Sequence, residues 1–515
     1  MSITKHKVLI RGVNWLGDAV MTTPAIRAWG KAKRESSVAL LANGQVLQLF
    51  KHDPHVESFI EYNNFHKTPI GKLKLISKLR GEQFVEALLL QNAFDAALIT
   101  FLAGIKSRIG YNRDGRGVLL TKSVPVDKNI LKLHQIDYFL NLIKAIGITP
   151  TTTMPWLYLL MDERLSARNE LDGLKRPVIG INPGAAFGPA KRWKEEGFAC
   201  LIKKIVANLG GSVVIFGASD DKPIVDSITS LLPVHIVNES GVFANFCGKT
   251  TVRQLCALIS ECDALVTNDS GPMHVAYAVG TPVVAIFGST EPALTSPPTA
   301  PKYEETGFLK VICRHKTKCS PCFERVCRYN HYKCLTDLSD DYVYEALCSI
   351  IPQTKAIFFD RDGTLCHDAH YLNCFDNFKV FPQIGCLKEL KDSGYKLIGI
   401  TNQSGIARGI VDEWFVNDVN KIFIDKYGFD GFYYCPHLSS ENCACRKPSP
   451  GLLYKARAEF GINLKASYFV GDKDSDILSA SAVGAKPVFF KSAQYEQSVN
   501  DVPVIGCLTQ LRELL

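Results

Sequence analysis

The chain has 515 residues, of which 46% are hydrophobic and 21% charged, and its formal net charge is +8 at neutral pH. This length exceeds what one ordinary hydrophobic core needs, and we expect three domains. The mild positive charge suits an acidic substrate or an anionic surface. It is too small and too dispersed to indicate nucleic acid, which we exclude as a partner.

The N-terminus does not predict a signal peptide, because Arg11 and Asp18 interrupt its short apolar run. No stretch of the sequence approaches the roughly 20 apolar residues that are needed to cross a bilayer. We therefore expect a cytoplasmic protein. In that compartment the 17 cysteines should be thiols or metal ligands, not a disulfide framework.

Three series of apolar runs alternate with helix-like segments along the chain. The runs cover residues 7–13, 37–43 and 86–92, then 177–184, 211–217, 263–269 and 282–288, and finally 355–365, 395–405, 468–476 and 484–490. Strands that alternate with helices are typical of parallel, doubly wound sheets. We predict an α/β protein with three Rossmann-like domains, at residues 1–170, 171–350 and 355–515. The first two, in tandem, should form a cleft at the carboxyl ends of their strands.

The first strand of the third series ends in two aspartates, Asp360 and Asp362. Nearby carboxylates suit Mg²⁺, a hard cation that prefers oxygen ligands, and Asp472 after a later strand is the expected third carboxylate. Asp360 can attack phosphorus while Asp362 protonates the leaving oxygen. Thr401 can donate to phosphoryl oxygens, and Lys447 can neutralise their charge. Each motif alone could be a polar strand-end loop, but four in this order favour a phosphate site.

Residues 355–500 resemble the haloacid dehalogenase superfamily, and within it the bacterial heptose 1,7-bisphosphate phosphatases and the related histidinol-phosphate phosphatases. The resemblance implies that Asp360 is the nucleophile and Asp362 the acid/base, and that both bind magnesium together with Asp472. The substrate contacts that it implies are Asp368, Tyr371, Thr401, Asn402, Gln403, Ser404, Arg446, Lys447 and Lys473.

The same resemblance implies a zinc-bound loop in place of a large cap. Its ligands would be Cys435, His437, Cys443 and Cys445, a Cys₃His set suited to tetrahedral structural zinc. Zinc would hold Arg446 and Lys447 toward the phosphate. Only five residues separate His437 from Cys443, fewer than in many relatives, so the loop shape and the substrate choice stay open. The alternative is a set of thiols without metal.

Polar residues also follow strands of the first two series. Asp18 lies where the first strand passes into a helix, and by position it is more often an N-cap than a general base. Lys191 would bring positive charge to a leaving diphosphate. The helix start at Asp269, Ser270, Gly271 and His274 can cradle phosphate with backbone amides. Caps and turns of the fold are the alternative, and a lone histidine is more often a packing residue.

Residues 6–350 resemble the family 9 glycosyltransferases, specifically the lipopolysaccharide heptosyltransferases of the second-heptose type. The segments GDAVMTTPAIRA, PGAAFGPAKRW and TNDSGPMHVA carry the resemblance. It implies a glycosyltransferase B-type pair of domains, inversion at the anomeric carbon and no obligatory metal. Asp18 becomes the general base on the acceptor hydroxyl and Lys191 a diphosphate contact. The implied ADP-heptose contacts are Asp269, Ser270, Gly271 and His274.

The implied acceptor is the heptosylated Kdo–lipid A core, which the protein would meet peripherally at the inner membrane surface. Arg108, Arg113 and Arg116 could meet its phosphates, although a solvated basic loop explains them equally well. A further segment holds Cys319, Cys322, Cys327, Cys334 and His331. Its C-x₂-C step favours a second zinc site, but the remaining spacing is irregular, so metal and free thiols are equally weighted.

We therefore expect a bifunctional enzyme of heptose metabolism. Its first two domains would transfer heptose from ADP-heptose to the lipopolysaccharide core, and its third would remove the 7-phosphate of heptose 1,7-bisphosphate. Two alternatives remain: the phosphatase acts on histidinol phosphate, or the transferase part is an inactive docking module.

Overall fold

The structure is a computed structural model that describes residues 6–150, 154–298, 310–314, 317–441, 443–492, 495 and 502–515. It divides into two compact units. The first comprises residues 1–298 and 310–350, and the second contains residues 351–515. The predicted α/β class is confirmed, since each of three sheets has six strands and all pairings between them are parallel.

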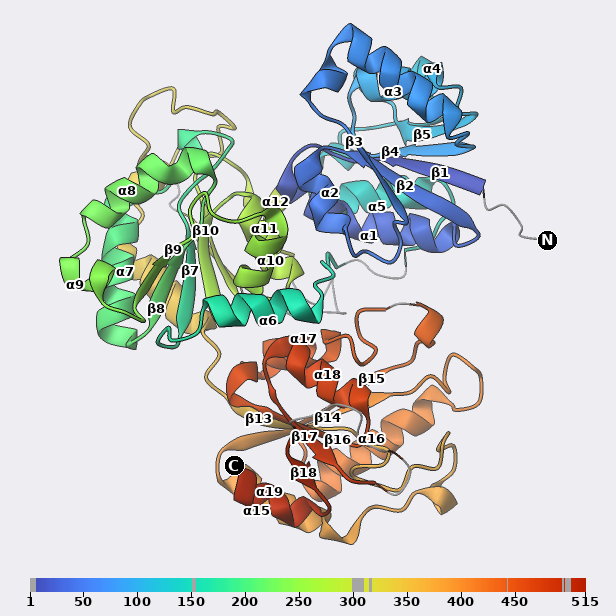
Figure 1. Ribbon diagram of the computed structural model, residues 1–515, viewed down its shortest axis with the longest axis vertical. Helices are drawn as coiled ribbons and strands as arrows, with labels where there is room; N and C mark the ends of the chain where they lie inside the picture. The colour runs from blue at the N-terminus through green and yellow to red at the C-terminus, as the bar shows by residue number, and fades with distance from the viewer. Residues whose placement is uncertain are drawn as a thin grey trace. The chain divides into compact units, whose positions relative to one another are not determined.

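The first sheet of the first unit has the order β3-β2-β1-β4-β5-β6. Its strands are β1 (His6–Arg11), β2 (Ser36–Ala42), β3 (Ser58–Glu61), β4 (Glu86–Leu89), β5 (Ser107–Tyr111) and β6 (Lys122–Val124). One face carries α1 (Leu16–Ala32), α2 (Gly44–Phe50) and α5 (Gln135–Ala145), and the other α3 (Pro69–Gly81) and α4 (Phe94–Leu102) (Figure 1). The three predicted strands are β1, β2 and β4. The outer strands β3, β5 and β6 were not predicted, because they are short and partly polar.

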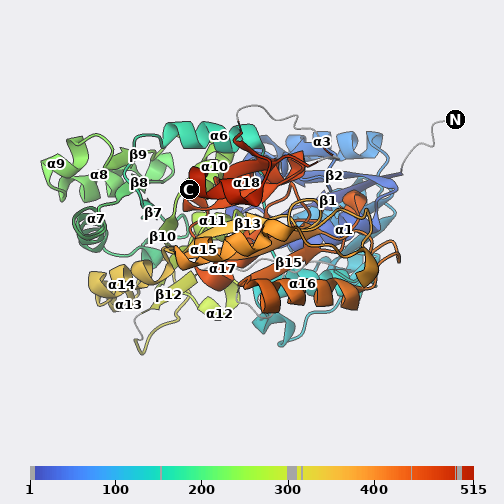
Figure 2. The same ribbon diagram turned by 90° about the horizontal axis from the view of Figure 1, so that it is seen from below.

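The second sheet has the order β12-β11-β10-β7-β8-β9. Its strands are β7 (Val178–Asn182), β8 (Ser212–Ile215), β9 (Phe243–Asn245), β10 (Ala264–Asn268), β11 (Val283–Phe287) and β12 (Lys310–Arg314). Every residue of β7, β10 and β11 is buried, as expected for parallel strands covered on both faces. The longer helices around it are α7 (Glu195–Leu209), α8 (Lys222–Ser230), α10 (Val252–Glu261), α11 (Gly271–Ala278) and α14 (Asp340–Ile350), and α14 lies beside α7 (Figure 2).

Two buried arginines tie these two sheets together through the backbone that crosses between them. Arg27 of α1 donates to the carbonyl oxygen of Trp156. Arg253 of α10 donates to the carbonyl oxygen of Tyr158 at 2.7 Å and forms an ion pair with Glu163 at the start of α6 (Met161–Glu170). Helix α1 also packs directly against α11. The loops at the carboxyl ends of both sheets therefore face each other within one compact unit.

The second unit contains the third sheet, with the order β15-β14-β13-β16-β17-β18. Its strands are β13 (Lys355–Phe359), β14 (Tyr395–Asn402), β15 (Gly431–Cys435), β16 (Tyr468–Gly471), β17 (Lys486–Phe490) and β18 (Val504–Ile505). Helices α17 (Gly451–Phe460) and α18 (Asp474–Val483) cover one face, and α15 (Leu387–Asp392) and α16 (Glu413–Tyr427) the other (Figure 1). An aromatic cluster that includes Phe359, Phe423 and Phe429 fills the core under α16.

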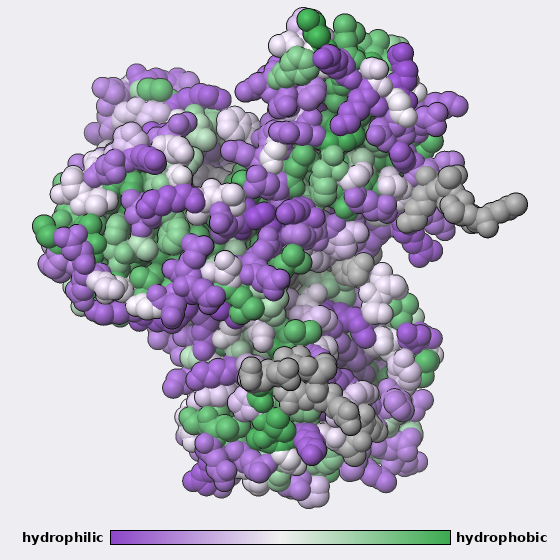
Figure 3. Space-filling view, viewed as in Figure 1, coloured by the Kyte–Doolittle hydropathy of each residue, from purple (hydrophilic) through white to green (hydrophobic). Residues whose placement is uncertain are grey.

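The surface is mixed in character. On the face seen in Figure 3, hydrophilic residues alternate with small patches of apolar residues. Within the described part of the chain, no helix combines the length and the apolar character that spanning a membrane requires.

Candidate active sites

Three carboxylates gather at the carboxyl edge of the third sheet. Asp360 follows β13, Asp472 follows β16, and Asp476 lies in the first turn of α18. One oxygen of each lies within 4.8 Å of the others, and each residue is at most 4% exposed. Neither carboxylate oxygen of Asp472 has a hydrogen-bond partner among the described residues. An unpaired buried carboxylate is costly, so this group is suited to a divalent cation with oxygen ligands.

The backbone beside this group is shaped to the carboxylates. Gly363 has a φ of +94°, and a Cβ atom there would lie 2.1 Å from Oδ2 of Asp472. Burial, followed by the negative charge of Asp360, raises the pKa of Asp472 to about 7. A bound cation would reverse this effect, because it favours the ionised form.

Asp362, one of the predicted magnesium ligands, is not part of this carboxylate group. Both of its oxygens accept hydrogen bonds from the Arg361 side chain at 3.1 Å, and Gln403 donates to Oδ2 at 2.7 Å. Burial by itself would raise the pKa of Asp362, but Arg361 and these hydrogen bonds hold the pKa below its usual value. Its carboxylate therefore belongs to a separate network, and Asp476 occupies the third place in the acidic group.

Lys447 is the cation of the acidic group. It is 4% exposed, and its Nζ lies 2.9 Å from Asp360 and 2.7 Å from Asp476. Burial would lower the pKa of Lys447, but these two carboxylates outweigh burial and raise it. The side-chain amide of Asn402 donates to the carbonyl oxygen of Lys447 at 3.2 Å and accepts the backbone N–H of Lys447 at 3.1 Å. The β14 loop thus holds the lysine in place as a buried, charged group.

Other predicted substrate contacts lie around this centre. Lys473 Nζ is 3.1 Å from Asp368, which also accepts from the hydroxyl of Tyr495 at 3.5 Å. Thr401 donates to Asp362 at 3.4 Å. Tyr371 is 39% exposed and packs beside Gly405, next to Ser404. The structure thus brings most of the predicted residues to one edge of the sheet.

The predicted zinc ligands form a compact quartet. The Sγ atoms of Cys435, Cys443 and Cys445 lie 3.3–3.5 Å apart, and His437 Nδ1 is 3.2 Å from Cys445 and 3.5 Å from Cys435. A tetrahedron with metal–sulfur bonds of about 2.3 Å has edges of roughly 3.7 Å. The set therefore fits a zinc ion. Arg446, which follows directly, donates to the carbonyl oxygen of His437 at 3.2 Å.

A second constellation lies at the carboxyl ends of the two sheets of the first unit. Lys191 Nζ forms an ion pair with Asp269 at 2.5 Å and lies 4.8 Å from the centre of the Phe187 ring. Thr290 donates to the same carboxylate at 2.6 Å. Ser270 accepts a hydrogen bond from Asn182 at 3.2 Å. The loops after β7 and β10 are thereby joined into one surface around the start of α11.

The N-cap interpretation of Asp18 is wrong. The residue that caps α1 is Trp15, which makes no side-chain cap bond, and Asp18 lies inside the first turn. Burial raises the pKa of Asp18 to about 6; the nearby Lys191 lowers it and Asp269 raises it. At neutral pH the group is therefore mainly ionised, with a basicity well above that of an ordinary aspartate. That is what a general base on a hydroxyl requires.

His274 contacts α1 directly. A Cβ atom on Gly17 would lie 2.5 Å from Cδ2 of His274, so glycine permits this contact. The other side of the ring bonds to the hydroxyl of Tyr277 at 3.0 Å. Burial lowers the pKa of His274 to about 4. The imidazole is therefore neutral at physiological pH and brings no charge to a ligand.

The three arginines of the predicted basic loop differ from one another. Arg116 is fully buried and donates to the carbonyl oxygen of Tyr111 at 2.9 Å, while Arg108 donates to the carbonyl oxygen of Leu119 at 2.6 Å. The side chains of Arg108 and Arg116 hold the loop together. The structure therefore fits neither the phosphate contacts nor the solvated basic loop that the sequence suggested for these two residues. Arg113 is half-buried.

Comparisons with known proteins show which families the two regions resemble. The sequence profile of glycosyltransferase family 9 (heptosyltransferase) matches residues 72–333, just over half of the chain. The chain is 30% identical over 360 residues to lipopolysaccharide heptosyltransferase 2 of Escherichia coli K12, which covers 68% of this chain and 100% of the relative. The chain belongs to glycosyltransferase family 9. A solved structure of E. coli ADP-heptose lps heptosyltransferase II, 29% identical, matches 67% of this chain and 98% of that chain with a TM-score of 0.57.

The C-terminal region of this family 9 chain has relatives of its own. A HAD-hydrolase-like profile matches residues 444–504. The region is 41% identical over 145 residues to D-glycero-beta-D-manno-heptose-1,7-bisphosphate 7-phosphatase of Haemophilus ducreyi, over 26% of this chain and 80% of the relative. Both resemblances indicated by the sequence motifs are therefore confirmed: a heptosyltransferase II-like region is followed by a heptose bisphosphate phosphatase-like region.

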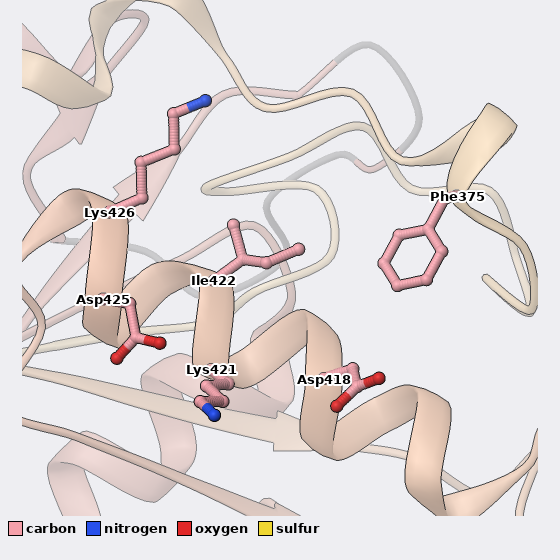
Figure 4. Close-up of a pocket in the computed structure, with 6 residues that line it drawn as sticks. All are labelled: Phe375, Asp418, Lys421, Ile422, Asp425 and Lys426. Carbon is pink, nitrogen blue, oxygen red and sulfur yellow. The ribbon is translucent and has the colours of Figure 1, made fainter.

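Sequence reasoning missed Arg361 and Asp476 as members of the candidate site in the second unit. Asp476 ends the same motif that supplied Asp472, so its spacing of four residues at a helix start was a usable signal. A hollow on α16 is a different feature. It is lined by Phe375, Asp418, Lys421, Ile422, Asp425 and Lys426 (Figure 4). None of these residues belongs to either constellation.

Proposed function

We propose that this chain is a bifunctional enzyme that transfers heptose from ADP-heptose to the heptosyl-Kdo–lipid A core and also hydrolyses the 7-phosphate of heptose 1,7-bisphosphate. The observation that carries the proposal is that buried aspartates pair with a lysine at two separate places, Asp269 with Lys191 and Asp360 with Lys447, in regions similar to these two enzyme classes. The domain limits proposed with it are residues 1–170, 171–350 and 355–515. The protein would act in the cytoplasm and meet the inner membrane surface peripherally.

In the transfer reaction, Asp18 takes the proton of the acceptor hydroxyl. The resulting oxygen attacks the anomeric carbon of the donor from the face opposite the diphosphate, and the carbon–oxygen bond to ADP breaks with inversion. Lys191 stabilises the charge that develops on the leaving diphosphate. The Asp269 carboxylate holds the Lys191 ammonium at this position. Backbone amides at the start of α11 add donors for a phosphate, beside Ser270 and Gly271.

In the phosphatase reaction, an oxygen of Asp360 attacks phosphorus and the bond to the sugar oxygen breaks. Asp362 gives a proton to that oxygen, then removes one from the water that releases phosphate from Asp360. Arg361 holds the resting Asp362 carboxylate in its ionised form. An approaching phosphate dianion repels the negative charge of Asp362 and so favours the protonated form of Asp362, which is the form that donates the proton.

Lys447 balances the charge of Asp360 during this sequence, since its ammonium lies 2.9 Å from that carboxylate. Asp360, Asp472 and Asp476 would hold the magnesium ion. When bound, Mg²⁺ supplies neutralisation of phosphoryl charge. The zinc quartet would fix the loop that carries Arg446 and Lys447. Lys473 and Asp368, whose side chains lie 3.1 Å apart, would contact the sugar.

The transferase half is tested by ADP release from ADP-heptose in the presence of a defined heptosyl-Kdo–lipid A acceptor. We expect release that depends on the acceptor. No acceptor-dependent release from a folded chain would overturn this half and favour the docking-module alternative.

The phosphatase half is tested by phosphate release from both anomers of heptose 1,7-bisphosphate, with histidinol phosphate as the matched competitor. We expect kcat/KM to be higher for a heptose substrate. The opposite preference would assign the region to histidinol phosphate and leave the transferase half unaffected.

A further inference from the structure

The loop from residue 317 to α13 (Lys333–Thr336) in the first unit carries a cysteine motif that neither proposed reaction uses. Among the described residues, its thiols belong to neither of the close groups of metal-ligating side chains, so the structure gives no support to the second zinc site. Loops of this length without regular secondary structure are uncommon in compact domains and are often functional. The role of this loop is indicated by where it is attached and by the side chain that it brings there.

The loop is attached to the second sheet on both sides of strand β10. On one side, the backbone N–H of Phe323 donates to the carbonyl oxygen of Ser289, just after β11, at 2.8 Å. On the other side, the backbone N–H of Ala190, in the segment after β7, donates to the carbonyl oxygen of Arg325 at 3.1 Å. Strands β11 and β7 are the two neighbours of β10. The loop is therefore fixed at the edge of the sheet where Asp269 follows β10.

A close backbone contact fixes the position of Arg325. A Cβ atom on Gly188 would lie 2.5 Å from the carbonyl oxygen of Arg325, and Gly188 has a φ of +150°, a conformation that favours glycine. Gly188 and Ala190 stand just before Lys191 in the chain. The segment that carries Lys191 and the loop that carries Arg325 are thus joined through backbone atoms. A change in the side chain of Arg325 should leave this attachment intact.

The side chain of Arg325 lies beside the lysine of the proposed transferase site. The guanidinium carbon of Arg325 is 5.2 Å from the centre of the Phe187 ring, and Lys191 Nζ is 4.8 Å from the centre of the same ring. The two cations are therefore close neighbours that share one aromatic side chain. Contacts of this kind hold a positive group in place without neutralising its charge.

The two cations differ in what balances their charge. Lys191 forms an ion pair with Asp269 at 2.5 Å. Arg325 is exposed and has no acidic partner among the described residues, since the adjacent Glu324 pairs with Arg328 instead, at 2.6 Å. A guanidinium presents planar donors that match the oxygens of a phosphate group bidentately. Arg325 is therefore available to an anion that approaches Lys191.

We propose that Arg325 is a second cation for the diphosphate of the donor, beside Lys191. The ligand class is a nucleoside diphosphate or its sugar ester, because two linked phosphates can bridge two cations that lie on one ring. Phe187 positions both cations. In the transfer reaction the two charges together stabilise the diphosphate as it leaves. This inference rests on the proposed transferase function and adds to it a substrate-binding residue from the cysteine loop.

Binding of ADP to the full-length chain, measured by isothermal titration calorimetry, tests Arg325. We expect Arg325→Met, which removes the charge and keeps most of the length, to raise the Kd for ADP about tenfold, as the loss of a charged hydrogen bond at an exposed site should do. Arg325→Lys should recover part of the affinity. The difference between the wild type and Arg325→Met should narrow as salt is added, because salt screens exposed charges. A purely structural loss would not depend on salt in this way.

Arg328→Met is the matched control. Arg328 lies on the same loop, is exposed and is already paired with Glu324, so its loss should leave the Kd for ADP within about twofold of wild type. An unchanged Kd in Arg325→Met would overturn the proposal. An equal loss of affinity in Arg325→Met and Arg328→Met would also overturn it, since the loop would then act only through its overall charge.

Transfer gives a second readout. We expect Arg325→Met to lower kcat/KM for ADP-heptose by more than its effect on the Kd for ADP, because the charge on the leaving diphosphate grows in the transition state. A wild-type chain that binds ADP through Arg325 but transfers no heptose would overturn the proposed function and leave this inference standing. A wild-type chain that does not bind ADP would overturn both.

Discussion

The two reaction centres differ in how completely the protein balances their charge. In the proposed phosphatase centre, Asp360 and Asp476 share the buried Lys447, and Asp472 has no hydrogen-bond partner among the described residues. In the proposed transferase centre, Lys191 and Thr290 satisfy Asp269. The unpartnered Asp472 leaves a place for an added cation, whereas Asp269 is neutralised by a lysine of the chain itself. The same side-chain chemistry thus predicts a metal-dependent reaction at one site and a metal-independent reaction at the other.

The largest expected effect separates the two centres by removing the nucleophile. Asp360→Asn should lower phosphate release by a factor on the order of 10⁴, because amide oxygen is a poor nucleophile toward phosphorus. ADP release by the same protein should stay within twofold of wild type. Parallel assays on one preparation measure both rates. A variant that keeps a tenth of its phosphatase rate would exclude Asp360 as the nucleophile.

The converse substitution is made in the transferase centre. Asp18→Asn should lower ADP release by roughly 10² to 10⁴, the usual contribution of a general base. Phosphate release should not change, which makes it the internal control for folding. Survival of transfer in this variant would mean that another group takes the proton of the acceptor.

Omission of magnesium sharpens the contrast without any substitution. We expect dialysis against magnesium-free buffer to lower phosphate release by about 10²-fold or more, because a Lewis acid contributes several kcal/mol to transition-state charge stabilisation. ADP release should be retained, and added Mg²⁺ should restore phosphatase activity. Loss of both activities, or of neither, would contradict the prediction that only the phosphatase reaction needs the metal ion.

The pH dependence of transfer reports the state of Asp18. Its pKa is raised to about 6, and a base acts only when it is deprotonated. The kcat/KM for transfer should therefore be level above pH 7 and fall about tenfold per pH unit well below 6. A profile that stays level down to pH 4.5 would be inconsistent with Asp18 as the base.

The smallest expected effect concerns Arg361, which positions Asp362 without touching substrate. Removing its charge in Arg361→Met should raise the pKa of Asp362, because the guanidinium favours the ionised form. The phosphatase pH profile should move to higher pH by about one unit. Arg361→Lys should restore part of the shift. A lower rate with an unmoved profile would indicate a purely structural role.

The sequence predicted a site residue well where an apolar strand fixes its position, and poorly where tertiary contacts fix its side-chain direction. The aspartates after β13 and β16 could be predicted because apolar strands place them at a known edge of the sheet. The role of Arg361 could not be inferred, although it directly precedes Asp362 in the chain, because the direction of its buried side chain also depends on a hydrogen bond to Asn420 of α16. Strands β3, β5 and β6 were missed because short outer strands lack a continuous apolar run.

The assignment of Asp18 shows a second kind of limit. A carboxylate near a helix start favours capping when the boundary is unknown. The boundary lies three residues earlier, at Trp15, and this shift frees the carboxylate for other uses. Boundaries of this precision depend on tertiary packing, here on the contact between α1 and α11.

The contact between Gly17 and His274 joins α1 to α11, next to Asp18. An added methyl group at Gly17 would lie 2.5 Å from Cδ2 of His274, so one of the two helices would have to shift. In the transfer reaction that we propose, this shift would carry Asp18 away from a sugar bound beside α11, and Gly17→Ala would slow transfer without altering any group that takes part in the chemistry.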